Sequence, residues 1–109
     1  MNFPKLQATT NNLQVLLEEY TYKDVTVPIG FLTNGSNIPR LLWNIIPPFK
    51  PLYSPAYLVH DYLCKLEQYE LADKYFEELL YMADGENVVT KSMVIAVRVY
   101  HRLRYGVYK

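Results

Sequence analysis

The sequence has little cysteine and no long apolar run, and each scarcity excludes a class of protein. Cys64 is the only cysteine among 109 residues, so no disulfide can form within the chain, which is typical of a reducing compartment. The longest strongly apolar stretch, LLWNIIPPF, is too short and too rich in proline to span a bilayer. The first twelve residues lack the apolar segment of a secretory signal. We therefore expect a cytoplasmic protein (in the host cytosol if a phage encodes it) with no membrane span.

Acidic residues are missing from the end of the chain. Residues 87–109 contain five bases and no acid, whereas residues 61–86 hold eight of the 11 acids, and the formal net charge is zero. This segregation fits two helices of opposite sign packed side by side, or a binding face. The basic segment matches no known nucleic-acid reader and carries an apolar stripe that we expect to face the core, so nucleic acid is not an expected partner. The stripe comprises Met93, Ala96, Val97, Tyr100 and Leu103.

Half of the residues are apolar and a fifth are charged, which is a globular composition, and the length fits one domain over residues 1–109. The first part, residues 1–32, predicts a small antiparallel sheet of two or three strands. Residues 13–22 and 25–31 are rich in strand-forming residues and are separated by a plausible turn, and residues 3–8 supply a possible third strand.

The rest of the chain, residues 33–109, predicts a cluster of about four helices. The first begins at Ser36 or Asn37, the second runs from a Ser54 cap to about residue 66, and the third covers roughly residues 71–83. The fourth is capped by Asn87 and continues to about residue 105. The predicted fold class is therefore α+β.

The segment VHDYLCKLEQYELADKYF places three ionisable side chains in helices that otherwise look apolar. His60 shares a helix face with Leu63 and Cys64, and Asp73 lines up with Phe76 on the next helix. A short connection makes these helices antiparallel neighbours. A bare buried carboxylate costs on the order of several kcal/mol. Asp73 therefore needs a partner, which we expect to be His60, with Arg40 or Arg98 as the next candidates.

A histidine held by a carboxylate can act as a general base, because the acid fixes the tautomer and stabilises the imidazolium. His60 would then take a proton from water, Asp73 would orient it, and Asp61 would bind a water or a divalent metal ion. The alternative is a buried His–Asp hydrogen bond that only locks two helices together. His60 and Cys64 also have the spacing of a helical metal pair, but two ligands are too few to predict a metal centre.

Four motifs occur in order: GFLTNGSNIPR, PAYLVHDYLC, ADKYFEELL and AVRVYHRLRYG. They resemble a small family of tailed phages and prophages that is known only as a domain of unknown function. The family pattern runs GF-x-TDGASIPR, an HD dipeptide on a helix, AD-x-x-F and an AVR segment. The resemblance covers about residues 30–106. It implies a shared fold and a shared polar cluster, but no activity.

Asn34 stands where that family usually has aspartate, which removes a third acid from the pattern, because an amide cannot act as a base. The order of His60, Asp61 and Asp73 is also similar to that in bacterial phospholipases A2. There the histidine activates water, the adjacent aspartate binds calcium and the distant aspartate orients the histidine. HD-type phosphohydrolases are excluded, because they need a histidine upstream of the HD pair and this chain has none.

Two functions remain open. The first is a hydrolase-like enzyme with His60, Asp61 and Asp73 as its catalytic residues. A small anionic ligand would be bound through the side chains of Asn34, Arg40 and Arg98. The second is a non-catalytic phage accessory protein: a virion or tail component, or an inhibitor that binds a host defence protein or a signalling nucleotide. The sequence identifies neither the ligand nor the partner.

Overall fold

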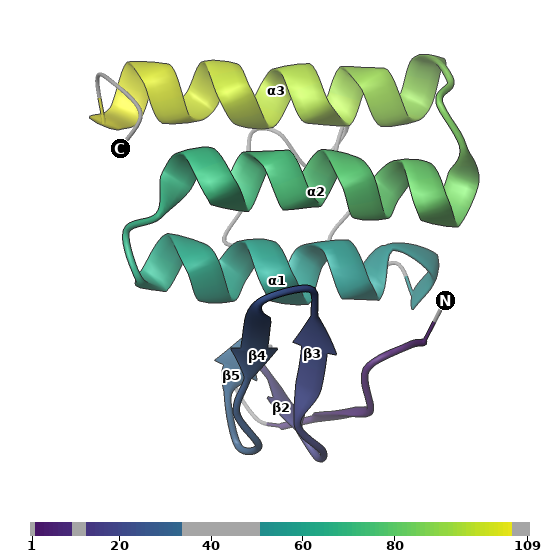
Figure 1. Cartoon of the computed structure of the whole chain (residues 1–109), viewed down its shortest axis with the longest axis vertical. Helices are drawn as coiled ribbons and strands as arrows, with labels where there is room; N and C mark the ends of the chain where they lie inside the picture. Colours follow the sequence, from purple (N-terminus) through teal and green to yellow (C-terminus); the bar gives the residue numbers. More distant parts are fainter. Residues whose placement is uncertain (1, 10–12, 34–50, 106–109) are drawn as a thin grey trace.

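The computed structural model describes residues 2–9, 13–33 and 51–105 (Figure 1). The described chain is α+β, as predicted, with short antiparallel strands first and helices after them. It contains three α-helices where about four were expected. The helix predicted to begin at Ser36 or Asn37 lies outside the described residues.

The strands form two small antiparallel sheets where one was expected. One sheet has the strand order β1-β2-β5 and the other is the β3-β4 hairpin. The strands are β1 (Leu6–Ala8), β2 (Gln14–Leu16), β3 (Tyr20–Tyr22), β4 (Val25–Val27) and β5 (Leu32–Thr33). The third strand expected within residues 3–8 is therefore present as β1.

The strand predicted over residues 13–22 is interrupted by a bend. It separates β2 from β3 at Leu17 and Glu18, so the two halves join different sheets. Leu16 and Tyr20 flank the bend and are both buried. The bend therefore lets the two halves pair in different sheets while both side chains stay in the core. The turn predicted after Tyr22 is confirmed, with Lys23 in a left-handed conformation at φ 52°.

Three helices run side by side, with α2 between α1 and α3 (Figure 1). They are α1 (Ser54–Lys65), α2 (Tyr69–Asp84) and α3 (Val88–Tyr105), and a 3₁₀ turn, η3 (Pro51–Tyr53), precedes α1. Helix α1 is buried on almost every face, because β4 and β5 contact it as well as α2. None of the described helices has the length and apolar character needed to cross a membrane.

The first residues of α1 differ from the prediction. Ser54 was expected to cap the helix, but its hydroxyl donates a hydrogen bond to the carbonyl of Pro51 at 2.8 Å, and the helix already includes Ser54. The prediction that this side chain caps α1 is wrong. The preceding 3₁₀ turn takes up the serine hydroxyl, so the cap position passes to Tyr53, whose side chain makes no capping bond.

The predicted cap of α3 is confirmed. Asn87 Oδ1 accepts a hydrogen bond from the Thr90 amide at 3.0 Å, and Thr90 Oγ1 accepts one from the Asn87 amide at 3.0 Å. This reciprocal pair satisfies two amides that the first turn of a helix leaves without partners. The pair therefore fixes where α3 begins after the connection from α2.

The buried face of α3 is rotated from the predicted stripe. Leu103 was assigned to the core and is 81% exposed. The helix instead buries a stripe that ends in a histidine and comprises Thr90, Met93, Val94, Val97 and His101. The sequence could not decide between the two stripes, because both offer apolar residues three and four positions apart. The rotation brings His101 to the interior.

The cap makes a testable contribution to stability. We expect Asn87→Ala to lower the free energy of unfolding by about 1 kcal/mol, because it removes the acceptor of the Thr90 amide. Asn87→Asp should retain most of the stability, since a carboxylate can accept the same hydrogen bond. Ser92→Ala, on the exposed side of the same helix, is the control and should be nearly neutral. Urea denaturation measures all three. Equal losses for Asn87→Ala and Ser92→Ala would contradict the assignment.

Candidate functional site

The predicted meeting of His60 and Asp73 is confirmed. His60 Nε2 on α1 lies 2.9 Å from Asp73 Oδ1 on α2, and the two side chains are only 3% and 1% exposed. The short connection between α1 and α2 makes the helices antiparallel and brings the two positions level. The buried aspartate therefore has the partner that its burial requires.

A second histidine binds the same carboxylate. His101 Nδ1, on α3, lies 3.0 Å from Asp73 Oδ2 and 2.9 Å from Oδ1. His101 was not among the site residues predicted from the sequence, so this second partner of Asp73 was not expected. The signal that could have found it is the helical spacing of His101 from Val94 and Val97, which places it on an apolar face.

The shared carboxylate fixes which ring nitrogens carry protons. An ionised carboxylate only accepts hydrogen bonds, so His60 must donate from Nε2 and His101 from Nδ1. In the neutral imidazoles, the lone pairs then lie on His60 Nδ1 and His101 Nε2. These two nitrogens are the ring positions that can accept a proton, accept a hydrogen bond or bind a metal ion.

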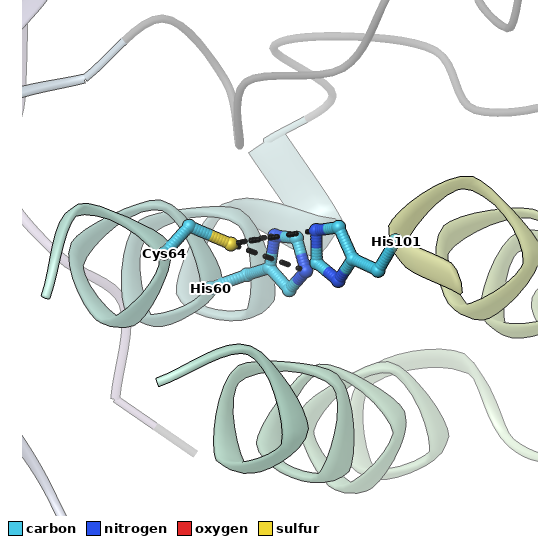
Figure 2. A group of neighbouring side chains, drawn as sticks. All are labelled: His60, Cys64 and His101. Atoms are coloured by element: carbon cyan, nitrogen blue, oxygen red, sulfur yellow. Dashed lines mark hydrogen bonds between the residues drawn. The ribbon is translucent and has the colours of Figure 1, made fainter. Parts of the chain in front are cut away.

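The sulfur of Cys64 lies close to both imidazoles, as Figure 2 shows. It is 3.7 Å from His101 Nε2, and 3.8 Å from both Nδ1 and Nε2 of His60. Cys64 stands one helical turn after His60 on α1, so the two side chains share a face. The ring centroids of His60 and His101 are 5.2 Å apart, with their planes 4° from parallel. The four side chains of His60, Cys64, Asp73 and His101 are called the His–Asp–Cys cluster below.

Burial and hydrogen bonding act in opposite directions on the Asp73 carboxyl. Burial raises its pKa, but the hydrogen bonds from His101 and His60 outweigh burial and lower the pKa to about 2. Asp73 is therefore ionised at neutral pH. Burial raises the pKa of the Cys64 thiol, and the nearby carboxylates of Asp73 and Asp61 raise it further. Cys64 is thus a protonated thiol in this state and not an activated nucleophile.

Aromatic rings enclose the cluster. The ring of Phe76 packs on His60 with centroids 4.9 Å apart, and Tyr69 meets His101 edge-on at 5.2 Å. Tyr57 stacks on Phe76 with ring centroids 6.1 Å apart and also lines a cleft of about 220 Å³ near the start of α1. His60 is not among the described residues that line this cleft.

The other predicted site residues lie in different places. Asp61 is fully buried next to His60 on α1, and its role as a water or metal ligand stays a prediction. Arg98 lies on α3, half exposed, and donates a hydrogen bond to Glu77 at 3.0 Å on α2. Asn34 and Arg40 lie outside the described residues. Within the described ranges, one group of three side chains could hold a metal ion, with one possible ligand atom from each within 4.8 Å of the others. The group is His60, Cys64 and His101, and it does not include Asp61.

The shared carboxylate should matter more for stability than a surface pair on the same helix. We expect Asp73→Ala to lower the free energy of unfolding by about 3 kcal/mol, because it leaves two buried N–H groups without an acceptor. Glu77→Ala, four residues further along α2, breaks the partly exposed pair with Arg98 and should cost less than about 1 kcal/mol. Chemical denaturation of both variants compares them. Losses of equal size would show that the buried hydrogen bonds contribute little.

The comparisons with known proteins identify a family. The family described as "Protein of unknown function (DUF1353)" matches residues 13–97, which include α1, α2 and the first half of α3. The match ends four residues before His101. No curated protein and no solved structure is significantly similar to the chain. With most of its length matched, the chain belongs to the DUF1353 family of proteins of unknown function.

Proposed function

We propose that the chain is a hydrolase-like protein whose chemistry takes place at the His–Asp–Cys cluster. His60 is the water-activating base and Asp73 is the residue that positions it. The observation that carries the proposal is the shared carboxylate: Asp73 accepts N–H groups from both His60 and His101. This arrangement leaves a basic nitrogen on each ring, and a basic imidazole nitrogen is what removal of a proton from water requires.

The composition of the cluster supports chemistry over simple helix packing. One His–Asp hydrogen bond is enough to join two helices, and well-packed apolar residues often stabilise a core as well as a buried ion pair does. Here the chain buries a second imidazole and a thiol beside the first pair. His101 adds a second hydrogen-bond donor to the buried carboxylate, and both His101 and Cys64 have a direct use in chemistry at this site.

The predicted roles of the remaining residues extend the proposal. Asp61 would orient the water, and Asn34, Arg40 and Arg98 would bind a small anionic substrate. The order of His60, Asp61 and Asp73 is similar to that in bacterial phospholipases A2. The four motifs of the sequence support a phage or prophage origin, for which the host cytosol is the proposed location.

A second candidate is a non-catalytic phage accessory protein, in which the cluster holds the three helices together and the function lies at a surface that binds a partner. The burial of the cluster favours this candidate. Each of its four residues is at most 7% exposed, and none of the four lines the cleft near α1. A substrate would reach His60 only after the side chains that cover it moved.

A hydrolysis assay separates the two candidates. The purified chain is tested with chromogenic carboxylic esters, phosphate monoesters and phosphodiesters, together with His60→Ala, Asp73→Asn and the control Lys74→Ala. Lys74 is exposed beside Asp73 on the outer side of α2. We expect turnover by the unmodified chain and by the control, with a loss of about 100-fold or more in His60→Ala, because general-base catalysis contributes factors of that size.

Folding of each variant is checked by circular dichroism and thermal denaturation. Variants that stay folded and lose turnover support the hydrolase. Absence of turnover with every substrate, combined with loss of the folded state in both cluster variants, would contradict the hydrolase and favour the accessory protein.

A further inference from the structure

We propose that the His–Asp–Cys cluster is a transition-metal site. His60 Nδ1, Cys64 Sγ and His101 Nε2 would coordinate a divalent ion such as Zn²⁺, and Asp73 would orient both imidazoles from outside the coordination sphere. The inference deepens the proposed function of this cluster, because a bound metal ion would then activate the water. It is also testable without any hydrolysis.

The first argument is the convergence of scarce residues. The chain has one cysteine and two histidines, and all three lie together although they come from α1 and α3 (Figure 2). Thiolate and imidazole are the ligands that zinc prefers. The two helices that supply these side chains do not follow each other in the chain. Packing of the helices alone does not require two imidazoles and a thiol at one place.

The second argument is which nitrogen of each ring carries the lone pair. Asp73 occupies Nε2 of His60 and Nδ1 of His101, so the remaining nitrogens are Nδ1 and Nε2 respectively. Both lie near the sulfur of Cys64, at 3.8 Å and 3.7 Å, and the sulfur is equally close to His60 Nε2 at 3.8 Å. A thiol has one proton and can donate to only one of them. A metal ion bound to a thiolate could contact both nitrogens and the sulfur at once.

The third argument is geometric. Zinc lies about 2.3 Å from sulfur and about 2.0–2.1 Å from nitrogen, so a tetrahedral site separates sulfur and nitrogen by about 3.6 Å. The two sulfur–nitrogen separations in the cluster are within about 0.2 Å of this value. One ligand atom of each of the three residues lies within 4.8 Å of the other two. The sulfur–nitrogen separations of the cluster are therefore close to those of a zinc site before any ion is added.

The fourth argument comes from the residues around these ligands. Metal-binding histidines usually donate their second N–H to a carboxylate, which fixes the tautomer and the ring orientation, and Asp73 does this for both rings. The Asp73 carboxylate also places a negative charge beside both imidazoles, which favours a cation there. On binding, the S–H bond breaks, its proton leaves to solvent and a metal–sulfur bond forms.

Three protein ligands leave one position of a tetrahedral zinc ion available. That is the usual arrangement in catalytic zinc sites, where a water molecule fills the fourth position and its pKa falls to about 7. If the cluster hydrolyses a substrate, the metal-bound water would take over the proton-transfer role assigned to His60. If it does not, the same ion would join α1 to α3.

Cobalt binding tests the proposal directly. The full chain, with any affinity tag removed, is treated with chelator and then titrated with Co²⁺. We expect one equivalent to bind, with the near-ultraviolet absorption of a sulfur–cobalt bond and the intense visible bands of tetrahedral cobalt. Because Cys64 is the only cysteine, the sulfur band can arise only from this site. Zn²⁺ should displace the cobalt and abolish both absorptions.

Variants give the expected magnitudes. Cys64→Ser should remove the sulfur–cobalt absorption, and Asp73→Asn should weaken zinc binding about 10- to 100-fold while the sulfur band is retained. Lys74→Ala, outside the cluster, should bind as the unmodified chain does. If Cys64→Ser fails to fold, the spectrum of the unmodified chain still decides whether sulfur is a ligand.

The outcomes for the metal site and for the hydrolase can be told apart. One equivalent of cobalt with a sulfur band, without hydrolysis of any substrate, supports the metal site and contradicts the hydrolase. Hydrolysis by the chelator-treated chain, without a sulfur band on addition of Co²⁺, supports a metal-free base and overturns the metal site. A folded chain that binds neither Co²⁺ nor Zn²⁺ overturns it as well.

Discussion

The negative charge of Asp73 is the constraint on which the arrangement of the three helices depends. A carboxylate buried in an apolar interior must be matched by hydrogen-bond donors, and both donors here come from other helices, His60 from α1 and His101 from α3. Sliding either helix by one turn, about 5.4 Å, would break its bond. The acid on the middle helix therefore fixes the register of its two neighbours, while the apolar side chains supply most of the driving force.

Much of the fold follows from local signals. Turn residues and strand-forming runs predict a small antiparallel sheet, and Asn87 with the apolar periodicity after it predicts α3 from its first turn. Two features depend on packing that local patterns do not contain. The bend at Leu17 and Glu18 places β2 and β3 in different sheets while Leu16 and Tyr20 both stay buried. The Ser54 hydroxyl donates to the carbonyl of Pro51 in η3 and so does not cap α1.

The site was predictable in part, for a physical reason. His60 and Asp73 lie on consecutive helices joined by a short connection, so helical spacing is enough to bring them together. His101 lies 28 residues beyond Asp73, and its place in the interior depends on how far α3 rotates about its own axis. That rotation is decided by the choice between two apolar stripes of similar quality, one ending at Leu103 and the other at His101.

The order of the helices has a consequence for the growing chain. During synthesis the α1–α2 hairpin leaves the ribosome before α3. At that stage the Asp73 carboxylate has a hydrogen-bond donor in His60 but not yet in His101. Residue 101 must emerge before the acid has its full set of donors. Until then, closing the hairpin tightly would bury a charge that is only half matched, which disfavours a compact intermediate. Among these three helices, α3 is therefore the one that completes the burial of the Asp73 charge.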